Sequence, residues 1–124
     1  MTHRRALLLI DHGSRKQEAN DLLPEVARML KAMSDFDIVY YAHLELAEPT
    51  ILQGFDACVA EGAAEVIVHP YFLSPGRHST LDIPRMVAEA AAKHPGIRYR
   101  ITEPLGLHPK IGELILERVR QTGT

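Results

Sequence analysis

The feature that most constrains this chain is a fourfold alternation of a short apolar segment with a longer amphipathic one. The apolar segments are nearly continuous in hydrophobic residues, as expected of strands that are covered on both faces. The amphipathic segments repeat apolar residues at helical spacing. We predict strands at Arg5–Ile10, Ile38–His43, Glu65–Phe72 and Arg98–Thr102, with helices from an Asn20 or Asp21 cap to Met33 and at Pro49–Glu61, Asp82–His94 and Pro109–Arg120.

Strands that alternate with helices of this length predict an α/β fold, with a parallel sheet between two helical layers and right-handed crossovers. We expect one three-layer domain over residues 1–124, with the four strands in the order 2-1-3-4. The chain then changes direction between the first and third strands. Ligands bind in such sheets beyond the carboxyl ends of the strands, at that switch point. The loops that start at Asp11 and Leu73 should therefore flank the site.

Composition argues against several classes of protein. The chain is 46% apolar and 24% charged, an ordinary globular balance. Its net charge is −2 and no basic run exceeds Arg4-Arg5, which argues against nucleic-acid binding. The longest apolar run, Ala6–Ile10, is far too short to span a membrane, and no signal-peptide pattern precedes it. Cys58 is the single cysteine, so no intrachain disulfide can form. We therefore expect a cytoplasmic protein.

Histidine is the unusual component, with seven in 124 residues. His12 follows the first strand directly, and Gly13 permits a turn there. His78 ends the turn-forming loop Leu73–His78 after the third strand. Either segment could be only a connection between elements. Together, two imidazoles that converge on one crevice can bind a divalent transition metal and leave positions open for exchange.

Other polar residues have both structural and functional interpretations. Glu45 and Glu48 follow the second strand, where either could favour a helix N-terminus or could serve as a pocket carboxylate. Asp82-Ile83-Pro84 is typical of a helix start. Cys58 is expected in the core, His69 within a strand and His94 at a helix end, whereas His43 and His108 lie near the crevice and could contact site residues.

Five segments resemble the sirohydrochlorin chelatases, the short group of the class II chelatases. They cover nearly the whole chain in register, and they are specific in combination although none would suffice alone. The chain lacks the histidine-rich insert and cysteine-bearing tail of some relatives, so nothing predicts an iron–sulfur cluster. Many relatives carry glycine where Asp11 stands, and others carry aspartate. The matching segments are Asp11–Arg15, His43–Thr50, Pro70–His78, Asp82–Pro84 and Glu103–Pro109.

The resemblance implies that a divalent metal is inserted into sirohydrochlorin, giving sirohaem or a cobalt precursor of cobalamin. The metal (Co²⁺, Fe²⁺ or Ni²⁺) is then a substrate, and no permanently bound cofactor is expected. By position, His12 corresponds to the metal ligand and proton acceptor, and His78 to the second metal ligand. The implied substrate contacts are Glu48, Leu73, Ser74, Pro75, Gly76, Arg77 and His78.

Metal insertion requires a base for the two pyrrole protons and cationic groups for the substrate's carboxylates, a role that Arg15 and Arg77 could fill. The resemblance also implies a homodimer, since longer relatives contain two such halves and a two-fold pair would close the cleft. Two alternatives stay open. One is a non-catalytic metal or tetrapyrrole carrier. The other is a phosphoryl-transfer enzyme with His12 as nucleophile, which the neighbouring Asp11 would disfavour.

Overall fold

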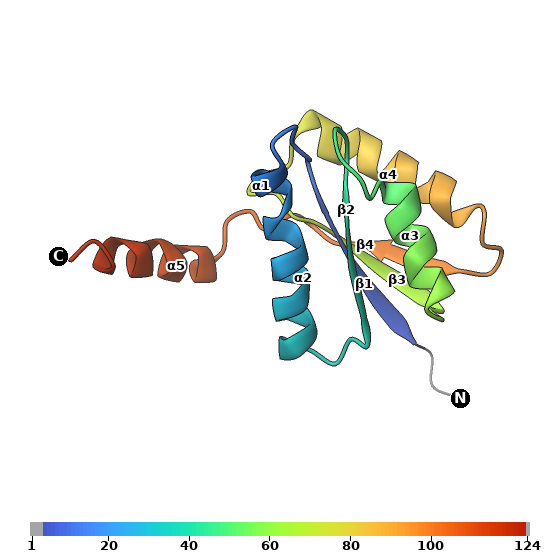
Figure 1. Cartoon of the computed structure of the whole chain (residues 1–124), viewed down its shortest axis with the longest axis horizontal. Helices are drawn as coiled ribbons and strands as arrows, with labels where there is room; N and C mark the ends of the chain where they lie inside the picture. Colours follow the sequence, from blue (N-terminus) through green and yellow to red (C-terminus); the bar gives the residue numbers. More distant parts are fainter. Residues whose placement is uncertain (1–3, 124) are drawn as a thin grey trace.

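The computed structural model describes residues 4–123, except for the side chains of residues 77–80. Four parallel strands form one sheet in the order β2-β1-β3-β4, which confirms the predicted α/β fold and strand order. Helix α2 covers one face of the sheet, and α3 and α4 cover the other (Figure 1). The elements are β1 (Arg5–Asp11), α1 (Gln17–Asn20), α2 (Leu22–Met33), β2 (Ile38–His43), α3 (Ile51–Ala60), β3 (Glu65–Pro70), α4 (Arg77–Ala91), β4 (Arg98–Ile101) and α5 (Pro109–Arg120).

The core lies mainly between the sheet and the α3–α4 layer. Alternate residues of β1, β2 and β3 face this layer, and Phe55 of α3 is fully buried against them. Cys58 is also fully buried here, as predicted, and burial raises the pKa of its thiol to about 12. A smaller cluster lies on the opposite face, where Leu9 packs against Leu23 and Ala27 of α2. These two clusters fix the sheet between its helical layers.

Helix α4 begins at Arg77 rather than at the predicted Asp82, and it ends at Ala91 rather than at His94. Pro84 therefore lies inside the helix, although an interior proline removes one hydrogen bond and costs about 3 kcal/mol. Ile83 and Val87 are completely buried beside it. The helix is continuous through Pro84, so the expected start at Asp82 was wrong.

Two other boundaries differ from the prediction because of local polar contacts. Helix α3 begins after Thr50, whose hydroxyl accepts a bond from the Gln53 N–H in a reciprocal capping box, rather than at Pro49. Asp21 precedes α2 but makes no capping bond with its side chain. Asn20 is not a cap either, because it ends the additional helix α1 and its side chain bonds elsewhere.

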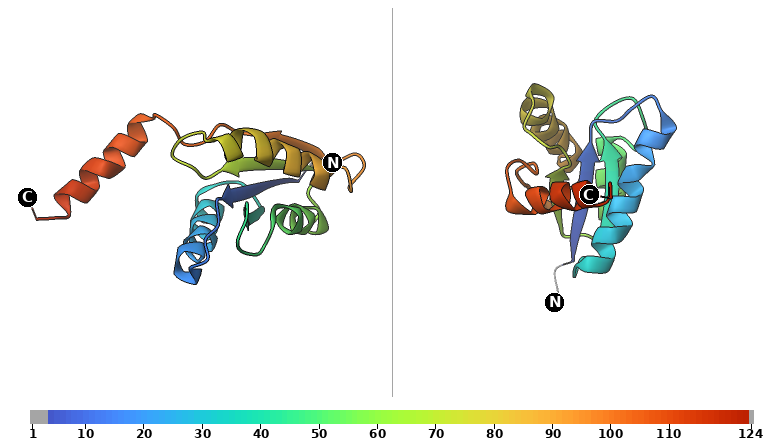
Figure 2. Two further views of the ribbon diagram at one scale, coloured as in Figure 1. Left: turned by 90° about the horizontal axis from the view of Figure 1, so that it is seen from above. Right: turned by 90° about the vertical axis from the view of Figure 1, so that its left-hand side faces the viewer.

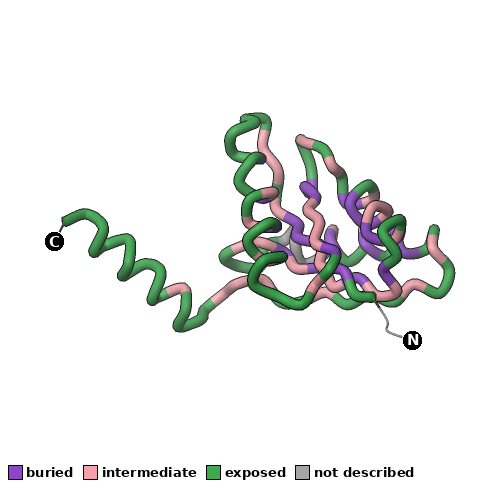
Figure 3. The backbone as a smooth tube through the Cα atoms, turned by 60° about the horizontal axis from the view of Figure 1, so that its bottom comes forward, coloured by how far each residue is buried: buried purple, intermediate pink, exposed green. Residues whose placement is uncertain are grey.

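Helix α5 forms as predicted but does not cover the sheet. It extends away from the other elements in two perpendicular views, Figure 1 and the left-hand view of Figure 2. No residue of α5, all of which the structure describes, is buried, and Figure 3 shows it exposed along nearly its whole length. None of the helices in the described part of the chain has the length and apolar character that a membrane span requires.

Candidate functional site

The site is built where β1 and β2 end. Asp11 and His43 are register partners at the last positions of the two strands. The backbone pairing continues beyond them, since the Leu44 N–H donates to the Asp11 carbonyl at 2.9 Å and the Glu45 N–H to the His12 carbonyl at 3.1 Å. This extension places the side chains that follow β1 and β2 next to each other, on the β2 side of β1 and beside the predicted switch point between β1 and β3.

His12 and Glu45 form the central contact of this site. His12 Nε2 lies 3.0 Å from Glu45 Oε1, and each side chain is 50% exposed. The edge of the Phe72 ring faces the imidazole, with centroids 6.2 Å apart. One nitrogen and one oxygen that could bind a metal ion thus lie side by side beyond the carboxyl ends of the strands, on side chains that are open to solvent.

The close approach of the two loops requires glycine at position 13. Gly13 has φ of +91°, and a Cβ there would lie 1.9 Å from the Glu45 carbonyl oxygen and 3.1 Å from the His43 Cβ. Any other residue would therefore push the Glu45 loop away from the His12 loop. Gly13 thus has a backbone conformation that favours glycine, and its contact with Glu45 leaves no room for a Cβ.

A cavity of about 590 Å³ lies beside this contact, between the loop after β1 and the loop after β2. Arg15, Glu45 and Glu48 all line it. Glu48 also accepts a 3.0 Å hydrogen bond from Gln53 Nε2 at the start of α3, so both interpretations of Glu48 have a structural basis. The cavity offers a cation and two carboxylates to a ligand that reaches His12.

The loop after β3 is the third side of the site. Leu73, Ser74, Pro75 and Gly76 are all exposed, and the Leu73 carbonyl accepts a 2.8 Å bond from the Gly106 N–H. The predicted loop Leu73–His78 is shorter than expected, because Arg77 and His78 belong to the first turn of α4. Their side chains lie outside the described part of the chain, so the pairing of His12 with His78 stays a prediction. Phe72, just before this loop, contacts His12.

Sequence reasoning left Glu45 and His43 unassigned and misread Asn20. Only the strand register brings Glu45 to His12, because the two residues are far apart in the chain. His43 is 1% exposed, and its Nδ1 lies 2.5 Å from Asp11 Oδ1. Asn20 is 5% exposed, and its side chain binds both the N–H and the carbonyl of Ser14. No signal in the sequence distinguishes an asparagine that bonds to the backbone of a loop in this way from one that caps a helix.

Three other histidines in the described part of the chain, His69, His94 and His108, have structural partners. His69 bonds to Thr102 Oγ1 at 2.8 Å, and burial lowers its pKa. His94 lies 2.6 Å from Asp56, linking the end of α4 to α3. His108 caps α5, where its Nδ1 accepts from the Lys110 N–H at 3.1 Å. Among the residues whose side chains are described, no group of three or more histidine, cysteine, aspartate or glutamate residues could hold a metal.

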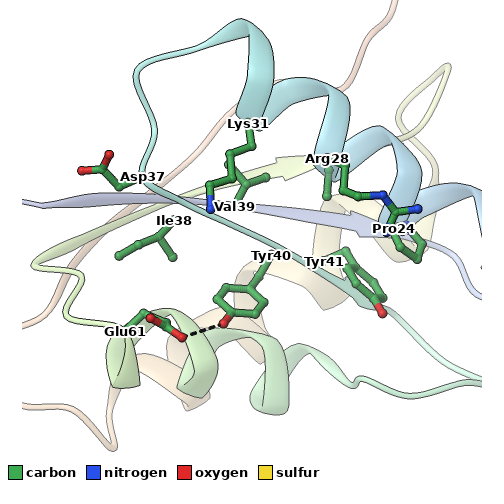
Figure 4. A pocket seen from close by; sticks show the side chains of 10 residues that line it. Pro24, Arg28, Lys31, Asp37, Ile38, Val39, Tyr40, Tyr41 and Glu61 are labelled. Carbon is green, nitrogen blue, oxygen red and sulfur yellow. Dashed lines mark hydrogen bonds between the residues drawn. The ribbon is translucent and has the colours of Figure 1, made fainter.

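A second cavity, of about 370 Å³, lies at the outer edge of β2 (Figure 4). Arg28 and Lys31 of α2 line one side of it, and Tyr40 and Glu61 line the other. Tyr40 donates a 3.0 Å hydrogen bond to Glu61, which raises the pKa of the phenol. The cavity has no histidine and shares no lining residue with the cavity beside His12, so it offers no comparable metal ligands.

Similarity to known proteins points to one family. Residues 6–122 match the family model named CbiX. The chain is 45% identical over 114 residues to the chloroplastic sirohydrochlorin ferrochelatase of Arabidopsis thaliana, covering 92% of this chain and 51% of that protein. It is 31% identical over 115 residues to the sirohydrochlorin cobaltochelatase of Sulfurisphaera tokodaii, covering 93% of this chain and 91% of the relative.

Solved structures agree with this similarity. The sirohydrochlorin chelatase SirB from Bacillus subtilis subspecies spizizenii, in complex with cobalt, superposes with a TM-score of 0.88 at 33% identity. The match covers 95% of this chain and 50% of SirB. The chain likewise spans only 51%, 39% and 44% of three of the curated relatives that it matches. The family match over residues 6–122, with these relatives, shows that the chain belongs to the CbiX family of sirohydrochlorin chelatases.

Proposed function

We propose that this chain inserts a divalent metal, Co²⁺ or Fe²⁺, into sirohydrochlorin, and that His12 and Glu45 are at the centre of the reaction. The observation that carries the proposal is the 3.0 Å contact between His12 Nε2 and Glu45 Oε1, beyond the carboxyl ends of β1 and β2 and beside the switch point of the sheet. The relatives named as ferrochelatases and cobaltochelatases support the reaction type. The choice between the two metals stays open, since imidazole and carboxylate suit both.

The spacing of the two donors suits metal capture. Imidazole nitrogens and carboxylate oxygens bind divalent transition metals at about 2.1 Å. Two donors 3.0 Å apart can both reach one ion at that distance, where they subtend an angle of about 90°. His12 and Glu45 would thus occupy two adjacent positions of the ion and leave the others open. His78 is our proposed third ligand, delivered from the first turn of α4.

Insertion then exchanges two protons for the metal. The metal forms bonds to the four pyrrole-type nitrogens as two N–H protons leave, and the bonds to the protein ligands break. His12 and Glu45 are the bases nearest to the transferred ion, so they accept the protons as the metal departs. Arg15, together with Arg77, would hold the peripheral carboxylates of the macrocycle beside the cavity that also contains Glu48.

An anaerobic assay with purified protein, sirohydrochlorin and Co²⁺ or Fe²⁺ tests this function. We expect catalysed conversion of the free macrocycle's absorption spectrum to that of the metallated product, above the spontaneous rate. Stoichiometric binding without turnover would instead indicate a carrier. Phosphoryl transfer is disfavoured further by the structure, because Glu45 adds a second carboxylate to Asp11 near His12.

We also propose that two copies associate, and that α5 is the contact between them. The α2 side of the sheet has an apolar groove of about 380 Å³, lined by Leu7, Leu9, Met29 and Tyr71 among others. Helix α2 lines one side of this groove, and His69 and Tyr71 line the other. The last helix, α5, does not cover the groove but extends away from it (Figure 1).

Helix α5 carries a surface that fits such a groove. Leu114, Ile115 and Val119 are 44%, 57% and 51% exposed on one side of the helix. Matched relatives such as SirB contain about as much chain again as this one. A second copy of this chain would supply a domain of about the same size as the unmatched part of SirB, with each α5 seated on the other copy. Two reciprocal contacts of this kind give a closed two-fold dimer.

Light scattering tests the dimer independently of activity. The parent should have about twice the 13.8 kDa chain mass at micromolar concentration. Replacing Leu114 and Ile115 with glutamine should yield a monomer, whereas replacing Glu113 and Glu117 on the opposite side of α5 should leave the dimer intact. A parent that is monomeric at these concentrations, or a double glutamine variant that stays dimeric, would overturn the arrangement. The expected cytoplasmic location stays a prediction.

A further inference from the structure

The two buried polar residues of the described chain both hold the loop that carries His12. Among the residues with described burial, only Asn20 and His43 are both polar and buried, at 5% and 1% exposure. Burying a polar side chain is unfavourable unless its hydrogen bonds are satisfied, so such residues are few and have a specific partner. The shared target of these two is the segment 11–14, which connects β1 to the site.

His43 fixes the start of this segment. Its Nδ1 lies 2.5 Å from Asp11 Oδ1, directly across the β1–β2 pairing, and Asp11 immediately precedes His12. Its own N–H donates to the Pro49 carbonyl at 2.8 Å, which ties the far end of the Glu45 loop to the same residue. His43 is thus bonded to Asp11, before His12, through its side chain, and to Pro49, at the far end of the Glu45 loop, through its backbone N–H.

Asn20 fixes the other end of the segment. Its Oδ1 accepts from the Ser14 N–H at 2.9 Å, and its Nδ2 donates to the Ser14 carbonyl at 2.7 Å. Both polar groups of one peptide position are thereby satisfied by one buried amide. Between Ser14 and Asp11, Gly13 packs directly onto the Glu45 carbonyl. His12 is thus carried on a segment that is held at both ends.

We propose that His43 and Asn20 are positioning residues for metal insertion, which hold His12 at its 3.0 Å distance from Glu45. This inference rests on the proposed function. Neither residue needs to touch the metal or the macrocycle. Misplacement of a reacting group by about 1 Å can lower a rate by about 100-fold. Two buried side chains that bond to the short loop of His12 would prevent such a displacement.

The sharpest test compares His43→Asn with His43→Leu, which have nearly the same size. The asparagine amide keeps a donor close to the position of Nδ1 and can bond to Asp11, whereas leucine cannot. We expect kcat for His43→Asn within about threefold of the parent and kcat for His43→Leu lower by about 10- to 100-fold, with KM for sirohydrochlorin little changed. The visible spectrum of bound Co²⁺ should follow the same order.

Asn20→Leu and Asn20→Asp extend the test to the second positioning residue. Leucine removes both bonds to Ser14, and aspartate keeps only the acceptor, so both should lose turnover, leucine by more. Ile38→Val, at the opposite end of β2, is the control that lowers stability without lowering kcat. If His43→Leu does not fold, Asn20→Asp decides: parental kcat in that variant overturns the proposal.

Two other results would also overturn it: folded leucine variants with parental kcat and Co²⁺ spectrum, or equal losses in His43→Asn and His43→Leu. Absence of turnover in the parent itself would instead reject the proposed function, and the Co²⁺ spectra would still report on the geometry of the loop.

Discussion

Replacement of Gly13 with alanine should show how much metal insertion depends on the geometry of the site, apart from the stability of the fold. A Cβ at residue 13 would lie 1.9 Å from the Glu45 carbonyl oxygen, whereas real Cβ atoms stay at least 3.0 Å from such atoms. The loops must therefore move apart by about 1.1 Å. The alanine must also adopt a φ of +91°, which costs about 1–2 kcal/mol.

The displacement acts directly on the contact between His12 and Glu45, because residue 13 is adjacent to His12. A shift of this size should lower kcat for metal insertion by about 100-fold. Gly96→Ala is a matched control: Gly96 has nearly the same φ, +88°, but a Cβ there would have no atom within 4 Å. The control should therefore lose similar backbone stability and retain full turnover.

The assay is anaerobic metallation with each variant, together with urea unfolding to measure the free energy of unfolding. We expect both alanine variants to be destabilised and only Gly13→Ala to lose turnover. If Gly13→Ala inserted metal at the parental rate, the 3.0 Å contact between His12 and Glu45 would have no bearing on catalysis.

Three further predictions follow from single side chains. Glu45→Gln should lower turnover by at least tenfold, whereas Glu48→Gln should mainly raise KM for sirohydrochlorin, as steady-state kinetics would show; the reverse order would reject Glu45 as a central base. Cys58, with a pKa of about 12, should react with iodoacetamide at pH 8.5 only after unfolding, and rapid labelling of the folded protein would contradict its burial. Burial lowers the pKa of His69 below 6.5, so the unfolded chain binds a proton at His69 more readily than the folded chain does. The free energy of unfolding should therefore fall as the pH falls below 6.5. In urea titrations His69→Gln should reduce this fall, and an unchanged pH dependence would refute the role of His69.

The hydrophobic pattern along the chain predicted the fold well. Strands covered on both faces are nearly continuous in apolar residues, whereas helices repeat apolar residues at helical spacing. The strand order followed from the alternation and the handedness of crossovers. The start of α4 was missed because Pro84 is typical of a first turn, whereas the helix begins before it, at Arg77. A local sequence pattern does not distinguish a proline in the first turn of a helix from one in its interior.

The sequence predicted which loops form the site, but not which side chains contact each other there. His12 could be placed at the switch point because it directly follows a strand. Its partner Glu45 depends on the register between β1 and β2 and on the turn at Gly13. The sequence also could not predict that α5 extends away from the sheet. The periodicity of α5 indicates an apolar face but not the surface against which that face packs.

The roles of His12 and His78 are tested most directly by the catalysed rate of metal insertion in His12→Ala, His78→Ala and His94→Ala, after subtraction of spontaneous metallation. We expect the first two variants to lose nearly all catalysed turnover and to remain folded. His94→Ala should be less stable, because it loses a 2.6 Å contact with Asp56, yet it should insert metal at the parental rate. Full catalysed rates in both His12→Ala and His78→Ala would contradict the assignment of this site.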